Sequence, residues 1–282
     1  MEKVKFMDLH YHVNPDLYKR RYNAISAGKK YQQLEGMVLI QSHLGSTVEV
    51  ATLAYQEELP VLGSLVLNNI SGGISTKSVL NTLGKFSSNN WSMLVSFPTN
   101  TGRNHISKLT RELSSIFLKN IGFSPETISE NGKLRPETTE VLKLSLDYPI
   151  SLSTGHASKE EIYLLIEYGY KIGLKKLLIT QPANPLTGFK GEELNKLASK
   201  FNFLWIEQTA LTYLLGYQTW EDFSYVVNNI PRVIYSSDLG QNTMMDIDEW
   251  YAASLNWFQQ MNLSVSNIEL LMKINPINFI KL

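Results

Sequence analysis

Short apolar runs alternate with helical patterns along the chain. The runs are continuous in hydrophobicity and are rich in Val, Ile, Leu and Phe. Runs of this kind are typical of parallel strands whose two faces are both buried. The pattern therefore predicts eight strands, over Val4–Asp8, Met37–Gln41, Val61–Leu67, Ser92–Phe97, Ile150–Thr154, Leu177–Thr180, Phe203–Glu207 and Val233–Ser236.

Helical patterns lie between these strands. Repetition of strand and helix at this spacing predicts right-handed βαβ units and a parallel sheet. Eight such units favour an α/β fold of the closed (β/α)8 TIM-barrel type, because an open sheet usually has about five or six strands. Ser158 and Glu161 have the spacing of a capping box. The predicted helices cover Thr47–Glu57, Ser75–Ser87, Asn104–Lys119, Glu137–Asp147, Ser158–Ile172, Gly191–Lys200, Trp220–Asn229 and Ile247–Met261.

One stretch, Ile121–Pro136, breaks this rhythm after the fourth strand. It contains the pair Asn131-Gly132 between short polar runs, a sequence that favours a tight hairpin. We interpret the stretch as a small hairpin insertion. No low-complexity segment or linker divides the chain, so the sequence predicts a single barrel domain over residues 1–282.

Composition narrows the functional classes. The chain has 282 residues, 43% of them hydrophobic, with 26 basic and 26 acidic side chains and no cysteine. The balanced charge gives no reason to expect nucleic acid as a partner, and the absence of cysteine excludes thiolate chemistry. An apolar leader and a membrane-length apolar run are both missing from the sequence. We therefore expect a cytoplasmic protein that acts on a small molecule, away from membranes.

The histidines gather at one end of the predicted strands. His10 and His12 follow the first strand, His43 follows the second, His105 comes shortly after the fourth, and His156 follows the fifth. The carboxyl ends of barrel strands form one face of the molecule, where the active sites of TIM barrels are built. A single histidine is often a satisfied core or surface residue, but the set of five indicates a common site.

The most specific motif is Asp8-Leu9-His10-Tyr11-His12. Residues i and i+2 of a strand point the same way, so His10 and His12 can bind one cation from one side. Imidazole suits zinc, iron and nickel. Asp8 is interpreted as a partner that orients one of the histidines.

A carboxylate follows the last predicted strand, in Ser236-Ser237-Asp238-Leu239-Gly240. In a closed barrel the last strand lies beside the first, so Asp238 can complete a metal site with the two histidines. It can also accept a proton from a metal-bound water. The alternative is an ordinary turn or helix N-cap aspartate.

Together these motifs resemble the amidohydrolase superfamily of metal-dependent hydrolases. The resemblance spans the chain. It is carried by His10-x-His12, His156 after the fifth strand, Asp238 after the eighth, and the tail Asn275-Pro276-Ile277-Asn278-Phe279. It implies metal ligands at His10, His12 and Asp238, with His156 as a fourth. It also implies hydrolysis by a metal-activated water, with Asp238 as the base and His156 as a further catalytic residue.

Two departures from the superfamily pattern favour one divalent metal over two. The fourth strand ends Ser96-Phe97-Pro98-Thr99 and lacks the lysine that often bridges two metals there. Gln181 stands after the sixth strand, where the superfamily usually has a histidine. Gln181, Glu207, His43 and His105 stay open as additional ligands or as partners of the ligands. Zn²⁺ is the first expectation for the metal, with Fe²⁺ or Mn²⁺ as alternatives.

Three further positions are candidates for binding an anionic group of a substrate. Arg21 follows the metal motif, and Arg103 opens the segment after the fourth strand. Gly73, in Gly72-Gly73, could offer backbone amides to an anion. Their alternatives are a solvated basic run, a structural ion pair and a simple turn.

The leading hypothesis is a metal-dependent hydrolase that cleaves an amide, ester, lactone or phosphoester bond of a small molecule. A metal-dependent lyase or decarboxylase is the first alternative. A barrel that binds metal or ligand without turnover is the second, because Gln181 replaces a ligand. Association into homo-oligomers stays open.

Overall fold

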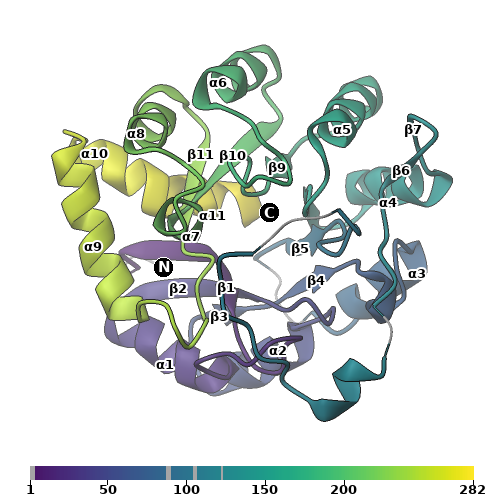
Figure 1. Ribbon diagram of the computed structural model, residues 1–282, viewed down its shortest axis with the longest axis horizontal. Helices are drawn as coiled ribbons and strands as arrows, with labels where there is room; N and C mark the ends of the chain where they lie inside the picture. Colours follow the sequence, from purple (N-terminus) through teal and green to yellow (C-terminus); the bar gives the residue numbers. More distant parts are fainter. Residues whose placement is uncertain (1–3, 87–89, 104–106, 122) are drawn as a thin grey trace.

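The computed structural model describes residues 4–86, 90–103, 107–121 and 123–282. The strands of its two main sheets are parallel and lie at the centre, and the helices surround them on the outside (Figure 1). In the described part of the chain, every helix is too short or too polar to span a bilayer. The predicted α/β class with parallel strands is therefore confirmed.

The central strands form two parallel sheets, of three and six strands. The smaller sheet has the order β1 (Phe6–His12), β2 (Gly36–Gln41), β3 (Val61–Leu62). The larger sheet has the order β11 (Val233–Ser236), β10 (Leu204–Thr209), β9 (Leu177–Ile179), β8 (Ile150–Ser153), β5 (Met93–Ser96), β4 (Ser64–Val66). The hydrogen-bonded strands therefore form two sheets, and not the single closed barrel that the sequence predicted.

The two sheets meet at both of their edges. The predicted strand Val61–Leu67 is divided at Gly63 into β3 and β4, which belong to different sheets. At the other junction the His12 amide donates to the Leu239 carbonyl at 2.8 Å, and the Asp238 amide donates to the His10 carbonyl at 2.7 Å. The end of β1 is therefore hydrogen-bonded to the segment that follows β11.

The helices begin where polar side chains cap their first turns. The capping box predicted at Ser158 is present, and Asn23 caps a helix after β1 that the sequence pattern did not reveal. The α-helices are α1 (Ala24–Gln33), α2 (Val48–Gln56), α3 (Thr76–Leu83), α4 (Pro136–Asp147), α5 (Lys159–Ile172), α6 (Gly191–Lys200), α7 (Ala210–Leu214), α8 (Trp220–Asn229), α9 (Ile247–Gln260), α10 (Val265–Glu269) and α11 (Asn275–Ile280).

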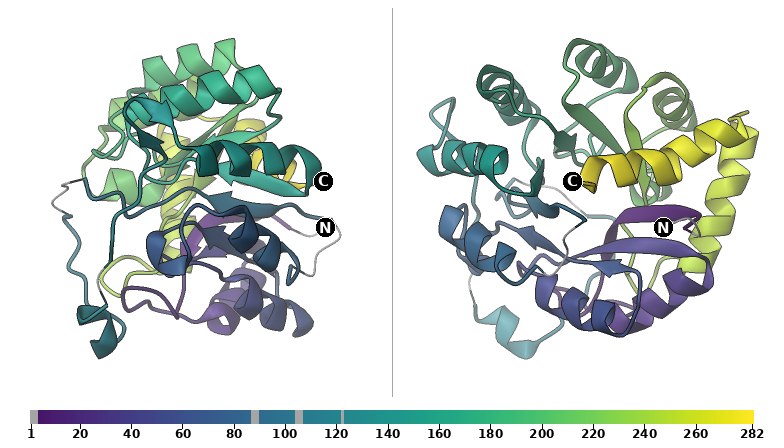
Figure 2. Two further views of the ribbon diagram at one scale, coloured as in Figure 1. Left: turned by 90° about the vertical axis from the view of Figure 1, so that its right-hand side faces the viewer. Right: turned by 180° about the vertical axis from the view of Figure 1, so that it is seen from behind.

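The helix predicted over Asn104–Lys119 is wrong. Residues 104–106 lie outside the described residues, and the rest of the stretch holds one short 3-10 turn, η2 (Ile116–Lys119). Its backbone pairs instead with the loop after β1, because the Ser114 amide donates to the Leu17 carbonyl at 3.1 Å and the Lys19 amide donates to the Glu112 carbonyl at 2.9 Å. We call residues 107–121 the strap. It projects beside the carboxyl ends of the strands (Figure 2).

The predicted hairpin region contains a short antiparallel pair. β6 (Ser129–Glu130) pairs with β7 (Lys133–Leu134), and the turn between them is Asn131-Gly132. Both turn residues have positive φ, at 51° and 71°, as a tight hairpin turn requires. That this pair is an insertion stays a prediction.

Buried apolar side chains of the strands and of α11 form a cluster at the end opposite the histidines. Phe279 and Ile280 of α11 pack with Met7 and Leu9 of β1 and with side chains of several other strands. Asn275 donates from its side chain to the Val233 carbonyl at 2.7 Å. The helix α11 therefore covers this end, seen from behind in Figure 2, and leaves the carboxyl ends of the strands as the accessible face.

A tight backbone contact fixes the loop that carries His156. Gly155 has φ +55°, and a Cβ atom there would lie 2.1 Å from the Phe97 carbonyl oxygen. The His156 amide donates to the Pro98 carbonyl at 3.0 Å. Glycine is thus required both for its left-handed conformation and for the close approach of two backbones.

We predict that Gly155→Ala destabilises the protein more than Gly173→Ala. Gly173 has φ +73°, but a Cβ atom there would lie in open space, with nothing within 4 Å of it. Its substitution should cost only the left-handed strain of roughly 1–2 kcal/mol. Gly155→Ala should add about 1–3 kcal/mol of overpacking. Urea denaturation of both variants measures the difference, and equal losses would contradict this account of the loop.

Candidate metal site

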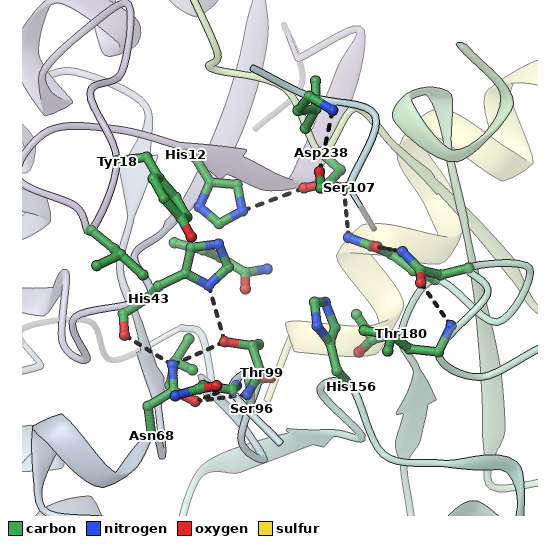
Figure 3. Close-up of a pocket in the computed structure, with 18 of the residues that line it drawn as sticks. His12, Tyr18, His43, Asn68, Ser96, Thr99, Ser107, His156, Thr180 and Asp238 are labelled. Carbon is green, nitrogen blue, oxygen red and sulfur yellow. Dashed lines mark hydrogen bonds and ion pairs between the residues drawn. The ribbon is translucent and has the colours of Figure 1, made fainter. Parts of the chain in front are cut away.

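A cavity of about 290 Å³ opens at the carboxyl ends of the strands. Four of the five histidines line it, namely His10, His12, His43 and His156, and Asp238 joins them. Figure 3 shows His12, His43, His156 and Asp238 facing the same space. His105 lies outside the described residues. The sequence-based clustering of histidines at one face is therefore seen for the four that are described.

A bulge in β1 turns His10 toward this cavity. The pairing of β1 with β2 shifts register between Asp8 and Tyr11, so β1 has one extra residue there. Without the bulge, His10 would share a face with Asp8, which contacts Tyr31 of α1 on the outside of the sheet. The bulge instead lets Leu9 enter the core while His10 and His12 both line the cavity.

The two imidazoles converge on one oxygen of Asp238. The Nε2 atoms of His10 and His12 each lie 3.3 Å from Asp238 Oδ1. All three residues are buried, with exposed fractions of 4–6%. Asp238 has φ +54°, a conformation that costs a non-glycine residue about 1–3 kcal/mol and is concentrated at functional sites. The end of strand β1 and a strained residue of the loop after β11 thus meet at a single point.

The opposite nitrogen of each imidazole faces another carboxylate. His10 Nδ1 lies 3.1 Å from Glu207 Oε1, and His12 Nδ1 lies 3.5 Å from Asp16 Oδ2. A carboxylate at Nδ1 favours the proton on that nitrogen and leaves the lone pair on Nε2. The hydrogen bond to Glu207 orients the His10 ring, whereas Asp16 faces His12 Nδ1 without a hydrogen bond. Each ring directs its Nε2 atom toward Asp238.

The carboxylates around His10 favour a positive charge at this point of the site. Burial lowers the pKa of His10, but the carboxylates of Glu207 and Asp238 outweigh it and raise the pKa to about 9. Burial raises the pKa of Asp238, and His10 and His12 reverse this effect, so the net shift is downward. Asp238 is therefore a carboxylate at neutral pH.

The spacing of the three donor atoms suits a tetrahedral zinc ion. Ligands at about 2.0–2.1 Å from zinc in a tetrahedral arrangement lie about 3.3 Å apart. That is the separation of each Nε2 atom from Asp238 Oδ1. The residues His10, His12 and Asp238 form a group whose ligand atoms all lie within 4.8 Å of one another. These residues therefore fit a divalent ion of this size.

A second group of donors, His12, Asp16 and His43, shares one histidine with the first. Its carboxylate is already satisfied, because Asp16 Oδ2 accepts from Arg20 Nε at 2.6 Å and Oδ1 accepts from the His43 amide at 2.6 Å. The guanidinium of Arg20 neutralises the charge of Asp16. This group therefore suits a cation less well than the first.

Asp8 does not orient an imidazole. Its Oδ1 accepts from the backbone amides of His10 and Ser237, each at 3.0 Å, and its Oδ2 accepts from Tyr31 at 2.6 Å. Burial raises its pKa to about 6. The sequence interpretation of Asp8 is corrected, because this carboxyl group ties β1 to the segment after β11. Glu207 occupies the orienting role at His10.

Gln181 contacts the site through its side-chain amide. Its Nε2 donates to Asp238 Oδ2 at 2.6 Å, and its backbone amide donates to Glu207 Oε2 at 3.2 Å. Its φ is +44°, a second strained residue at the site. An amide N–H directed at Asp238 leaves Oδ1 for the cation and orients Oδ2 away from it.

The remaining histidines line the cavity with different surroundings. His43 Nδ1 lies 3.0 Å from Thr99 Oγ1, and its ring centroid lies 4.7 Å from that of His12. Burial lowers the pKa of His156 to about 4, so its ring is neutral at physiological pH. His156 is not a member of either donor group. Its role as a fourth ligand stays a prediction.

Two of the predicted anion-binding positions do not face the cavity. The Arg21 guanidinium donates to the backbone carbonyls of Asn242 and Met244, at 3.1 and 2.5 Å. The Gly73 amide donates to the Asn68 carbonyl at 3.1 Å, and the Glu126 carboxylate fills the space beside it. Neither residue is among those that line the cavity, and anion binding at Arg21 and Gly73 stays a prediction.

Arg103 does line the cavity, but its guanidinium has partners. It pairs with Glu161 and donates to the His156 carbonyl at 2.7 Å. Sequence reasoning missed Asp16 and chose Arg21 in preference to Arg20, although Asp16 and Arg20 are the buried pair beside His12. The signal was present, since Asp16 follows His12 by four residues and Arg20 follows Asp16 by four. Nothing in the pattern distinguished Arg20 from its neighbour Arg21.

Comparison with known proteins places the chain in a family. Residues 5–207 match the profile of a family described as "Family of unknown function (DUF6282)", and the chain belongs to this family. No curated protein matches the chain. The family therefore groups the sequence with relatives but assigns no activity.

Solved structures share its fold. A probable 2-pyrone-4,6-dicarboxylic acid hydrolase from Acinetobacter baumannii with citric acid bound has a TM-score of 0.57 at 13% identity, over 98% of this chain and 99% of that one. An uncharacterised TIM-barrel protein from Bordetella bronchiseptica has a TM-score of 0.56 at 9% identity, over 97% and 98%.

A third structure makes the class of this fold explicit. An amidohydrolase from Burkholderia multivorans with bound HEPES has a TM-score of 0.54 at 10% identity, over 97% of this chain and 98% of that one. The predicted resemblance to the amidohydrolase superfamily is thus confirmed at the level of the fold. At these identities, the likeness concerns the fold.

We predict that Glu207→Gln weakens zinc binding by roughly 10- to 100-fold, because it removes the carboxylate that holds His10 Nδ1. The matched control is Asp8→Asn, a buried carboxyl two residues from His10 that keeps its acceptor oxygen for two backbone amides. Zinc titration against a chromophoric chelator measures both affinities. Equal losses in the two variants would contradict the orienting role of Glu207.

Proposed function

We propose that the protein is a metal-dependent hydrolase that cleaves an amide, ester, lactone or phosphoester bond of a small molecule. One divalent ion, with Zn²⁺ the first expectation and Fe²⁺ or Mn²⁺ as alternatives, would be held by His10, His12 and Asp238. The proposal treats residues 1–282 as one catalytic domain whose two sheets act as a (β/α)8 barrel, with the site at the carboxyl ends of its strands.

One observation carries the proposal. The Nε2 atoms of His10 and His12 both lie 3.3 Å from Asp238 Oδ1, while a carboxylate faces Nδ1 of each imidazole. Buried histidines with carboxylates at Nδ1 and a shared carboxylate at Nε2 have the arrangement expected of metal ligands. When bound, the ion would polarise the substrate carbonyl or phosphoryl oxygen and lower the pKa of a water molecule.

The residues around the ligands have separate tasks. Asp238 is ionised and can accept the proton of the attacking water at its carboxylate. Gln181 donates to Asp238 Oδ2 and fixes the plane of this carboxylate. His156 lines the cavity as a neutral ring and can hydrogen-bond a substrate oxygen or the leaving group. Asp238 and His156 are therefore the proposed catalytic residues.

The contact of Gln181 supports a site for one ion. Its amide N–H group points at Asp238, where a second metal ligand would be needed. The atom that glutamine could offer to a cation is Oε1, and this oxygen faces the side-chain amide of Asn184, at 3.4 Å. The strand β5 also supplies no lysine, since it ends at Ser96.

Metal analysis of the purified protein tests the proposal first. We expect about one divalent ion per chain, which His10→Ala removes because one of three ligands is lost. His43→Ala is the matched control, since His43 lines the same cavity but belongs to the weaker donor group. Absence of metal in the wild type, together with indifference to a chelator, would reject the proposal. Metal loss in His43→Ala but not in His10→Ala would move the ion to the second group.

Turnover is tested on a panel of ester, lactone, amide and phosphoester substrates. Asp238→Asn should lower kcat by roughly 100- to 10,000-fold through loss of the base, with a smaller effect on metal affinity. Bound metal without turnover of any substrate would reject hydrolysis. It would favour the alternatives of a lyase, a decarboxylase or a binding protein.

A further inference from the structure

The charges that line the cavity are unbalanced. Among the described residues, three arginines line it, namely Arg20, Arg103 and Arg111, against one carboxylate, Asp238. The chain as a whole carries equal numbers of basic and acidic side chains. The carboxylates of Asp16, Glu161 and Glu207 lie directly behind this lining, so each arginine has to be considered with its own partners.

Two of these arginines are neutralised by protein groups. Arg20 donates to Asp16 at 2.6 Å and is almost fully buried. Arg103 pairs with Glu161 and with the backbone of His156. Their charges serve to hold the site together, so neither has its guanidinium free for a ligand.

Arg111 differs from the other two. Within the described part of the chain it has no carboxylate within ion-pair distance, although its neighbour Glu112 pairs with Lys19. Its guanidinium carbon lies 4.9 Å from the centre of the Tyr18 ring. A guanidinium stacked on an aromatic face keeps its N–H groups at the edge, where they can bind an oxyanion in two-point fashion.

The position of Arg111 relates it to the metal site. Arg111 and His156 both line the cavity. Ring contacts run from Tyr18 to His43, at 6.3 Å between centroids, and from His43 to His12, at 4.7 Å. Arg111 therefore lies on the strap, at the side of the cavity formed by Tyr18 and His43, and lines the same cavity as the metal ligands.

The size of the cavity limits what can bridge these two points. A volume of about 290 Å³ is at the lower end of small-molecule pockets. A ligand with its reacting bond at His10, His12 and Asp238 has room for only a short chain of atoms before it reaches the strap. The second polar group of such a ligand would lie at the Arg111 guanidinium.

We propose that Arg111, stacked on Tyr18, binds an oxyanion of the substrate, a carboxylate or a phosphate, so that the enzyme acts on small anionic molecules. This inference rests on the proposed hydrolase function for the position of the reacting bond. It is separate from the predicted anion sites at Arg21 and Gly73, which do not line the cavity. Arg111 is a specificity residue, and it is separate from the metal ligands.

Calorimetric titration of the zinc-loaded protein tests the proposal without any need for turnover. The probes are succinate, 3-phosphonopropionate and the neutral succinamide. The variants are Arg111→Gln, Arg111→Lys and the control Lys119→Gln, which removes an exposed positive charge from the same strap outside the cavity. Each titration is repeated after chelator treatment.

The expected result is a loss of roughly 10- to 100-fold in affinity for the dianions in Arg111→Gln, with no change for succinamide. Arg111→Lys should retain part of the affinity, because it keeps the charge but loses the two-point geometry. Lys119→Gln should bind as the wild type does. A loss for only one dianion also supports the proposal and identifies the oxyanion as carboxylate or phosphate.

The result that would overturn the proposal is equal binding of both dianions by the wild type and Arg111→Gln. Equal losses in Lys119→Gln and Arg111→Gln would overturn it as well, because the effect would then belong to the general charge of the strap. The chelator arm separates this outcome from failure of the hydrolase proposal. A protein that binds no metal still reveals whether Arg111 binds an anion.

Discussion

The structure depends on the compensation of three carboxylates buried around two imidazoles. A buried charge is costly unless an opposite charge or hydrogen bonds offset it. The guanidinium of Arg20 offsets the charge of Asp16, and a hydrogen bond with the His10 ring stabilises the carboxylate of Glu207. Asp238 is left between the two Nε2 atoms, with Gln181 on its other oxygen. The left-handed backbone conformation of Asp238 is unfavourable, and it places the Asp238 carboxylate at this position. A cation between the three donors completes the arrangement, and this is the physical basis of the proposed metal site.

The backbone around the site is built to bring these groups together. The bulge in β1 turns His10 inward, and hydrogen bonds between the end of β1 and the segment after β11 set its height against Asp238. Gly240 permits this crossing, since its φ is +119° and a Cβ atom there would lie 2.1 Å from the His12 carbonyl oxygen. The strap then closes one side of the cavity and supplies Arg111.

The sequence allowed prediction of the parts that depend on local pattern. Continuous apolar runs predicted the central strands. The histidines that follow these runs predicted the position of the cavity, because the carboxyl ends of parallel strands share one face. The contributions that arise from long-range pairing were not predictable in this way. The strap was expected to be a helix, yet its backbone hydrogen-bonds to the loop after β1, which lies about a hundred residues earlier. Arg20 and Arg21 are adjacent in sequence, and only the direction of the chain at that point decides which one enters the site. The division of the strands into two sheets at Gly63 was likewise invisible to periodicity.

The most direct measurement of the central claim is a crystal structure of the zinc-loaded protein with anomalous diffraction at the zinc edge. The account predicts one strong peak per chain, at about 2.0–2.2 Å from the Nε2 atoms of His10 and His12 and from Asp238 Oδ1. A peak between His12, Asp16 and His43, or no peak in the cavity at saturating zinc, would contradict it.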